Sequence, residues 1–310
     1  MKIYILDAFH PAGIELAKRH AEVVCWPNPA ISNWPEDADG IMVRMTSVTG
    51  DQIRQAKKLK IICKQGVGFE TIDVASAHEC GIPVCRTPGI NSEAVAEMAL
   101  ALSLDVARRT SRFDRMLRRG DKIIRPENLG VEMHGKTIGI VGMGNIGSNV
   151  AKKWIGAFDA KILALDPNAP PDRWADIPHE RCANLQELLP RVDLLSLHIP
   201  MRESNRHIIG AKEIALMKPR AILINVSRGG LIDENALFHA LKNGHLFGAG
   251  LDVFELEPPP PDYPLLSLEN VVATPHAAGG TEETQERSAL QVAQEVIDVL
   301  AGKAPKNPVV

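Results

Sequence analysis

A glycine-rich turn between an apolar run and a helical pattern constrains the fold of this chain more than any other feature. Residues 137–141 are Thr-Ile-Gly-Ile-Val, which predicts a short buried strand, and the next six are Gly142-Met143-Gly144-Asn145-Ile146-Gly147. A helical pattern follows over residues 148–158, and a second apolar run over residues 161–165 ends at Asp166. Strand, Gly-x-Gly-x-x-Gly turn, helix, strand and acid together predict a βαβ unit that binds a dinucleotide.

Each position in this unit has a physical reason. Gly142 permits the tight turn, Gly144 lets a pyrophosphate approach the backbone, and Gly147 lets the helix pack close to the strand. The free N–H groups at the start of the helix face the phosphates. Asp166 can accept hydrogen bonds from the ribose hydroxyls, and its charge would repel a 2′-phosphate, which favours NAD over NADP. The alternative is a glycine-rich turn that binds nothing. We expect cofactor contacts at Gly142, Gly144, Asn145, Ile146, Gly147 and Asp166.

Composition bounds the class of protein. With 310 residues, of which 45% are hydrophobic and 24% charged, the chain is long enough for two α/β domains. The net charge of -3 gives no reason to expect nucleic acid or an anionic membrane as a partner. The five cysteines are odd in number and form no Cys-x-x-Cys, so we expect free thiols and no metal site. The chain has no membrane-spanning apolar run and no signal-peptide pattern, so we expect a cytoplasmic protein.

Short apolar runs alternate with helical patterns in two series along the chain. This alternation predicts an α/β protein with parallel sheets covered by helices. In the first series, we expect strands over residues 3–6, 22–25, 40–43, 60–63 and 82–85. In the second series, we expect strands over residues 137–141, 161–165, 193–198, 221–226, 247–253 and 271–274.

The second series interrupts the first. The last helix, over residues 282–300, has an apolar face formed by Ala289, Val292, Val296 and Val299, so we expect it to pack onto the first series. We therefore expect a substrate domain of residues 1–95 and 284–310, into which an NAD-binding domain of residues 96–283 is inserted. A cleft between two such domains is a common place for a small ligand.

A long helical pattern over residues 92–119 follows the first series. Its first half is small and apolar nearly all round, through Ala94, Ala96, Met98, Ala99, Ala101 and Leu102. We expect it to be buried, either between the domains or against a second subunit, and we expect a homodimer that forms through this region.

Polar residues follow three strands of the second series at their carboxyl ends, where ligands bind in a parallel sheet. Arg228, Glu257 and His276 follow the strands expected to end near residues 226, 253 and 274. A guanidinium grips a carboxylate bidentately, an imidazole exchanges a proton near neutral pH, and a carboxylate on its other nitrogen orients it and favours its protonated form. The three suit hydride transfer to or from C2 of a 2-keto or 2-hydroxy acid. The alternatives are a surface arginine, an exposed loop acid and a structural histidine.

Two more residues at this edge have two interpretations each. Asp252, at the end of its strand, either binds the nicotinamide carboxamide or caps a turn. His198, two positions before Pro200, fits a structural residue that lines the cofactor cleft better than it fits a catalyst.

Six motifs recur in one known family. They are VGMGNIG at 141–147, DLLSLHIP at 193–200, MKP at 217–219, NVSRGGLID at 225–233, LDVFELEP at 251–258 and TPHAAG at 274–279. With them the chain resembles the D-isomer-specific 2-hydroxyacid dehydrogenase family, which includes glycerate, phosphoglycerate and D-lactate dehydrogenases, over nearly its whole length. The resemblance implies a Rossmann-type NAD-binding domain inserted into a flavodoxin-like substrate domain, and a catalytic set at Arg228, Glu257 and His276. It also implies cofactor contacts at His198, Pro200, Val226, Ser227, Asp252 and His276.

The resemblance further implies where a small 2-hydroxy or 2-keto acid binds. The loop Gln65-Gly66-Val67-Gly68 would offer backbone N–H groups to the substrate carboxylate, as a backbone nest does for any anion. Arg44 matches a position that can contact the distal end of the substrate, and its alternative is a surface arginine. Substrate contacts are thus expected at Arg44, Val67, Gly68, Arg228 and His276.

Two observations leave open which substrate the protein takes and whether it is an enzyme or a binding module. Phe69-Glu70 replace the aliphatic residue and aspartate common after the second glycine of the loop, which leaves the size and polarity of the substrate undecided. Corepressors related to the family use the same fold and catalytic set as an NADH-responsive protein-binding module. That module is the alternative to an NAD-dependent 2-hydroxyacid dehydrogenase.

Overall fold

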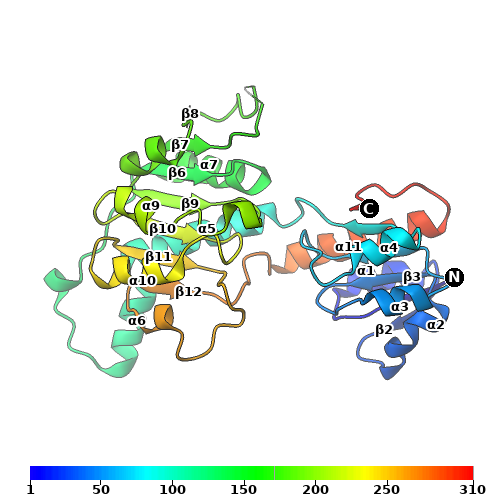
Figure 1. Ribbon diagram of the computed structural model, residues 1–310. Coiled ribbons are helices and arrows are strands. Elements are labelled where there is room, and N and C mark those ends of the chain that lie inside the picture. The colour runs from blue at the N-terminus through cyan, green and yellow to red at the C-terminus, as the bar shows by residue number, and fades with distance from the viewer. Residues whose placement is uncertain (171, 310) are drawn as a thin grey trace. The chain divides into compact units, whose positions relative to one another are not determined.

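The computed structural model describes residues 1–170 and 172–309 and divides the chain into two compact units (Figure 1). Unit 1 consists of Met1–Asn91 and Gly280–Val310, and unit 2 consists of Ser92–Gly279. These divisions fall near the boundaries at residues 95 and 283 that the sequence suggests. Pro171 and Val310, the last residue of the expected substrate domain, lie outside the described residues.

Unit 1 is a parallel sheet with helices on both faces. Its strands are β1 (Lys2–Ile5), β2 (Glu22–Cys25), β3 (Gly40–Val43), β4 (Ile61–Lys64) and β5 (Val84–Arg86). Its helices are α1 (Pro11–Lys18), α2 (Trp34–Asp37), α3 (Gly50–Gln55), α4 (Val74–Glu79) and α11 (Glu282–Leu300). The strand order β2-β1-β3-β4-β5 is that of flavodoxin-like folds, which confirms the predicted fold class. One apolar core lies under α1 and α11, and the other under α2, α3 and α4.

Helix α11 returns the end of the chain to unit 1. Ala289, Val292 and Val296 are fully buried against α1, β3 and β4, as the sequence predicts, while Val299 is partly buried. The approach to α1 is close, because a Cβ on Gly13 would lie 2.7 Å from the Cβ of Ala289. The first and last parts of the sequence therefore share one core.

Unit 2 is a seven-stranded parallel sheet. Its strands are β6 (Thr137–Val141), β7 (Lys161–Leu165), β8 (Glu180–Arg181), β9 (Leu194–Leu197), β10 (Ile222–Asn225), β11 (Gly248–Leu251) and β12 (Val271–Ala273). The order β12-β11-β10-β9-β6-β7-β8 reverses between β6 and β9, as in a Rossmann sheet, and ligands bind at this switch point. The strands lie where the sequence predicts them, with ends shifted by one or two residues, except β8. Strand β8 was not predicted, because it is two exposed charged residues at the sheet edge.

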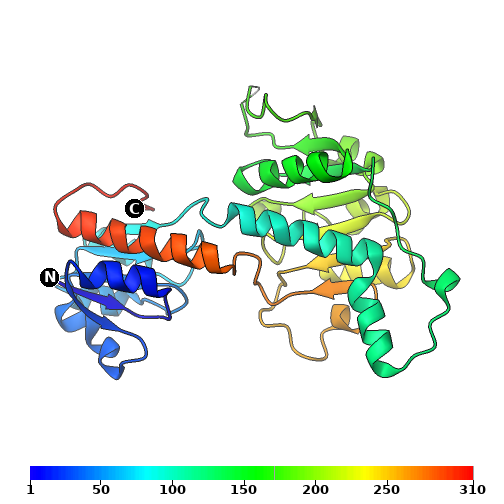
Figure 2. The same ribbon diagram turned by 180° about the vertical axis from the view of Figure 1, so that it is seen from behind.

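Helices cover both faces of this sheet too. They are α5 (Ser92–Arg108), α6 (Thr110–Arg119), α7 (Asn145–Phe158), α8 (Leu185–Leu188), α9 (Ala211–Leu216) and α10 (Glu234–Lys242). One core lies under α5 and α7, which run side by side in front of the sheet in Figure 2, and the other lies under α8, α9 and α10. Short 3₁₀ helices complete the chain: η1 (Pro29–Asn33), η2 (Arg125–Asn128), η3 (Leu189–Arg191), η4 (Glu203–Asn205) and η5 (Pro264–Ser267).

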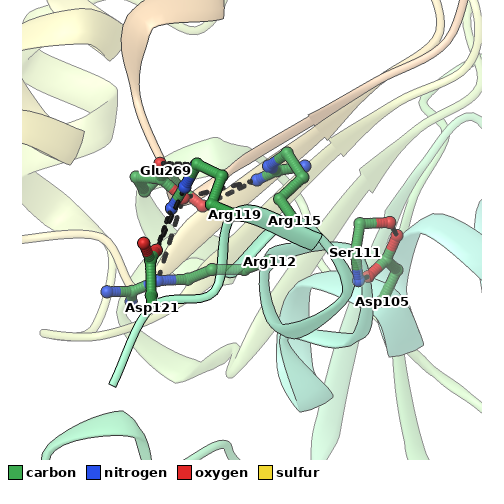
Figure 3. Close-up of polar contacts among 7 residues, drawn as sticks. All are labelled: Asp105, Ser111, Arg112, Arg115, Arg119, Asp121 and Glu269. Atoms are coloured by element: carbon green, nitrogen blue, oxygen red, sulfur yellow. Dashed lines mark hydrogen bonds and ion pairs between the residues drawn. The ribbon is translucent and has the colours of Figure 1, made fainter. Parts of the chain in front are cut away.

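The prediction of one continuous helix over residues 92–119 is wrong. Arg109 adopts a left-handed backbone with φ 57°, which ends α5 and starts α6 in a new direction. The carboxylate of Asp105 stabilises this break by accepting hydrogen bonds from the backbone N–H of Ser111, at 2.7 Å, and from its hydroxyl. Figure 3 shows Asp105 beside Ser111.

The buried side of α5 packs on its own unit, against α7, β10, β11 and β12. The expected contact of this segment with another domain or a second subunit stays a prediction. Helix α6 instead has no buried residue. Its arginines converge on Glu269, with Arg119 at 3.3 Å and Arg115 at 3.7 Å from the carboxylate (Figure 3).

Two further features bear on the class of protein. The five cysteines are free. Within residues 1–170 and 172–309, no helix has the length and apolarity needed to cross a bilayer.

Candidate cofactor and catalytic site

The glycine loop between β6 and α7 has the geometry that its sequence predicts. Gly142 has φ 87°, and a Cβ there would lie 2.7 Å from the carbonyl oxygen of His198. A Cβ on Gly147 would overlap the carbonyl oxygen of Gly142, so only glycine lets the helix start this close to the strand. A Cβ on Gly144 would meet no described atom within 4 Å. The first and third glycines thus serve the fold, and the second leaves open space above the backbone.

The start of α7 faces that open space. Gly144 precedes the helix, and no described side chain caps the N–H groups at its first turn, which includes Asn145 and Ile146. Uncapped N–H groups at the positive end of a 14-residue helix form an anion site. The loop and the helix start therefore fit the pyrophosphate of a dinucleotide.

Asp166 stands directly after β7, beside this loop. Its Oδ2 accepts a hydrogen bond from the N–H of Met143 at 3.1 Å, and its Oδ1 accepts one from the N–H of Asn168 at 3.3 Å. These two contacts fix the carboxylate next to the glycine loop. A carboxylate has about four lone-pair sites, so acceptor capacity remains for ribose hydroxyls.

His198 follows β9, on the other side of the switch point. Its Nε2 lies 2.8 Å from the hydroxyl of Ser196, whereas no described residue makes a hydrogen bond with its buried Nδ1. Burial lowers the pKa of His198 from 6.5 to about 3, so the ring is neutral at physiological pH. This favours the structural role over an acid–base role. Pro200, two residues on, is exposed and accepts a hydrogen bond from Asn205 at 2.9 Å.

Arg228 stands on a turn after β10 that Asn225 holds. Asn225 accepts hydrogen bonds from the N–H and hydroxyl of Ser227, at 3.0 and 2.7 Å, and donates to the carbonyl of Arg228 at 2.8 Å. Val226 and Ser227 are buried, and Arg228 is half-buried. This role of Asn225 was not among the predictions, although an asparagine that ends a strand before a turn is a signal for it.

The turn of Arg228 touches the loop of Glu257. A Cβ on Gly229 would overlap the carbonyl oxygen of Phe254, so the two backbones are in direct contact only because residue 229 is glycine. The close approach brings the loop after β10 and the loop after β11 together at one edge of the sheet.

Glu257 and His276 form a hydrogen-bonded pair. The Nδ1 of His276 lies 2.7 Å from Oε2 of Glu257, and Oε1 of Glu257 accepts a hydrogen bond from the N–H of Phe254 at 3.0 Å. Both side chains are partly exposed, at 48% for His276 and 34% for Glu257. Since the carboxylate accepts at Nδ1, the ring carries a proton there and presents Nε2 for chemistry.

Asp252 is fully buried and holds the loop of His276. Its Oδ1 accepts hydrogen bonds from the Thr274 hydroxyl at 2.5 Å and the Ala277 N–H at 2.9 Å, and its Oδ2 accepts from the Ala278 N–H at 2.9 Å. The carboxylate therefore caps this turn, one of its two expected roles. Contact with the nicotinamide carboxamide stays a prediction.

Three of the residues expected to bind substrate, Arg44, Val67 and Gly68, lie in loops at the carboxyl edge of the sheet of unit 1. The loop of Arg44 is fixed by Asp7, whose Oδ2 accepts the N–H of Arg44 at 2.5 Å and of Met45 at 3.1 Å. In the loop after β4, Gly66 has φ 111° and Val67 is 37% exposed. Both loops follow neighbouring strands, β3 and β4.

Comparisons with known proteins decide the family. The model for "D-isomer specific 2-hydroxyacid dehydrogenase, NAD binding domain" matches residues 100–278, which lie within unit 2. The chain belongs to this family. Members are NAD(H)-dependent 2-hydroxyacid oxidoreductases, so this family member is an enzyme and its cofactor is NAD.

Individual relatives cover the chain at full length. It is 38% identical to a glyoxylate reductase of Korarchaeum cryptofilum, over 99% of this chain and 95% of that protein. It is 41% identical to a D-3-phosphoglycerate dehydrogenase of Methanocaldococcus jannaschii, of whose length it spans 59%. A crystal structure of a putative D-isomer specific 2-hydroxyacid dehydrogenase from Polaromonas sp. JS6 66 superposes with a TM-score of 0.91 at 30% identity, over 100% of this chain and 99% of that chain.

Proposed function

We propose that Arg228, Glu257 and His276 perform the hydride-transfer chemistry of this dehydrogenase on a small 2-keto or 2-hydroxy acid. The observation that carries the proposal is the Glu257–His276 pair at 2.7 Å, together with the backbone contact between the loop of Glu257 and the turn of Arg228. Bound NAD supplies or accepts the hydride. The side chains must then bind the acid and exchange one proton.

His276 exchanges that proton at Nε2. In the reductive direction, Nε2–H donates to the substrate carbonyl oxygen and gives up its proton as the hydroxyl forms; in the oxidative direction Nε2 takes the proton back. Glu257 holds the ring in place through Nδ1. Arg228 binds the substrate carboxylate through two parallel N–H groups, which fixes C2 relative to His276.

Loops of unit 1 also bind the substrate in this proposal. The N–H groups of Val67 and Gly68 hold the carboxylate, and Arg44 approaches the distal end. The related proteins are named for two substrates of different distal chemistry, glyoxylate and phosphoglycerate. A cation at Arg44 suits a phosphate or carboxylate, and we therefore include both kinds of substrate in the test.

The experiment is a panel of 2-keto acids, assayed by consumption of NADH. The panel contains glyoxylate, hydroxypyruvate and phosphohydroxypyruvate, and the matching hydroxy acids are run as both enantiomers in the oxidative direction. We expect turnover on at least one acid, with the D enantiomer preferred. Turnover near background on the whole panel would contradict the proposal and favour the binding-module alternative.

We also propose a preference for NAD over NADP, since the carboxylate of Asp166 lies beside the glycine loop and its charge would repel a 2′-phosphate. We further propose a cytoplasmic homodimer. Free cysteines suit a reducing compartment. Helix α6 and the following segment expose Leu117, Ile124 and Leu129 at 69%, 44% and 66%, and apolar side chains so exposed favour a contact with a second copy. Light scattering at dilute concentration tests the dimer.

A further inference from the structure

The loop that carries Glu257 is closed at both ends by one carboxylate. The loop runs from residue 254 to residue 263, and Glu234, at the start of α10, lies against it. The N–H of Glu255 donates to Oε1 of Glu234 at 2.9 Å, and the hydroxyl of Tyr263 donates to its Oε2. A single side chain from another element thus bridges the residues that flank Glu257.

Contacts inside the loop complete the closure. The N–H of Phe254 donates to Glu257 at 3.0 Å, and the N–H of Tyr263 donates to the carbonyl of Pro260 at 3.0 Å. The rings of Phe254 and Tyr263 meet edge to face with centroids 5.9 Å apart. Phe254 is buried, so one end of the loop is anchored in the core. At the other end, the ring of Tyr263 packs on the core and its hydroxyl donates to Glu234.

The outer side of the loop is tied to the turn of Arg228. The carboxylate of Glu255 lies 2.8 Å from Nε2 of His207 and 3.8 Å from Arg206. The N–H of His207 donates to the carbonyl of Gly230 at 2.7 Å. A displacement of residue 255 would therefore reach both loops of the catalytic set.

Burial and hydrogen bonding act in opposite directions on the charge of Glu234. Burial raises the pKa of Glu234, while the hydrogen bonds from Tyr263 and from the Glu255 N–H act in the opposite direction. The neighbouring charge of Glu255 raises that pKa further, and His207 lowers it. Burial also raises the pKa of Tyr263, so its hydroxyl stays a donor. Two directed donors compensate the lost hydration of the carboxylate.

We propose that Glu234 is a positioning residue of the catalytic site, which holds loop 254–263 so that Glu257 meets Nδ1 of His276. It acts with Tyr263 as one unit. The inference rests on the proposed roles of Glu257 and His276, and it assigns no contact between Glu234 and substrate or cofactor.

The test uses graded variants of the full chain. Glu234→Gln keeps an acceptor for the Glu255 N–H, Glu234→Ala removes both acceptors, and Tyr263→Phe removes one hydroxyl. Glu213→Gln is the matched control, because Glu213 is a half-buried acid in the first turn of α9 that accepts the N–H of Gly210 at 3.2 Å, on a different helix.

We expect kcat to fall about tenfold or more in Glu234→Ala and less in Glu234→Gln, since misplacement of a catalytic pair by a fraction of an ångström costs rate. The KM for NADH should stay within about twofold in both. Amide exchange at Glu255 and Glu257, measured by NMR, should accelerate in the same order. The double variant with Tyr263→Phe should be no slower than Glu234→Ala alone, because the two residues act as a unit.

Three outcomes would overturn the proposal. One is a kcat equal to that of Glu213→Gln in both Glu234 variants. The second is a loss of activity that matches a loss of folded protein, with amide exchange at residues 255 and 257 unchanged. The third is additive effects of Glu234 and Tyr263. If Glu234→Ala fails to fold, Tyr263→Phe alone must still lower kcat and speed exchange at residue 255.

Failure of the proposed function has a different signature. If His276→Ala retained normal turnover, the catalytic roles would be wrong, whatever the Glu234 variants do. The exchange measurement needs no turnover, so it reports on the loop even then.

Discussion

His276 occupies a left-handed backbone position, with φ 53°. This conformation is strained for a residue with a Cβ, and such strain is concentrated at functional sites. The surroundings hold it in place, because its N–H donates to the carbonyl of Asp252 at 2.7 Å and the next two N–H groups donate to the Asp252 carboxylate. The backbone position of His276 is therefore set by Asp252, and Glu257 holds its ring.

Replacement of His276 by alanine tests its proton-transfer role. We expect kcat to fall by about 10²- to 10⁴-fold, the range for loss of a general acid–base group. Binding of NADH, measured by fluorescence titration, should change little, because the glycine loop is untouched. Glu257→Gln should lower kcat by a smaller factor, since an amide still accepts from Nδ1 but carries no charge. Near-normal turnover in His276→Ala would refute the role.

Asp166 is the residue on which cofactor choice should depend. In Asp166→Ala we expect the ratio of kcat/KM for NADH to that for NADPH to fall about tenfold, which corresponds to about 1.4 kcal/mol of lost repulsion. Asp166→Asn separates charge from hydrogen bonding, because the amide oxygen can still accept from Met143. If both variants kept the wild-type ratio in steady-state kinetics, another residue would select the cofactor.

At the scale of elements, the three glycines of the β6–α7 turn should respond differently to alanine. Gly147→Ala places a methyl onto the Gly142 carbonyl, and we expect a loss of about 1–3 kcal/mol in the free energy of unfolding. Gly144→Ala has room in the fold, so its unfolding temperature should not change, but the methyl takes the space of the pyrophosphate and should raise the KM for NADH about tenfold.

The control for this pair lies on the same helix. Gly156 is exposed in α7, and a Cβ there meets no described atom within 4 Å. Gly156→Ala should leave the KM for NADH unchanged and raise stability by up to about 1 kcal/mol. An unchanged KM in Gly144→Ala would show that the open space above the loop does not receive the cofactor.

The elements also show what sequence alone can predict. Apolar runs locate the buried strands, and the carboxyl ends of parallel strands must meet at one edge, so the convergence of Glu257 and His276 was predictable. The break at Arg109 was not, because it depends on Asp105 bonding to a residue six positions on. The role of Glu234 was not predictable either. It follows from distances between separate loops, which no local pattern encodes.

At the scale of the whole molecule, the two units differ in how the chain builds them. Unit 2 is one continuous segment, whereas unit 1 needs both ends of the sequence. Ala289 and Val292 of α11 belong to the same core as Ile3 and Ile5 of β1. One face of the sheet of unit 1 is therefore fully covered only when the last helix has packed on it. Both cores of unit 2 are formed by residues of its own continuous segment.

A neutral, partly buried histidine in unit 2 should make the stability of the molecule depend on pH. Burial lowers the pKa of folded His198 from 6.5 to about 3, so between these values the unfolded chain binds a proton that the folded chain does not. Stability from this group is complete above about pH 6.5 and is lost as the pH falls, by about 1.4 kcal/mol per unit. In chemical denaturation from about pH 6.5 to about pH 4, the free energy of unfolding of His198→Gln should therefore fall less steeply than that of the wild type, by about 1.4 kcal/mol per pH unit.

His134→Gln is the control, because that side chain is 66% exposed, and its free energy of unfolding should depend on pH as in the wild type. If stability fell equally steeply with pH in all three proteins, the folded state would accommodate a charged imidazole at residue 198. The hypothesis of a neutral ring at this position would then be wrong.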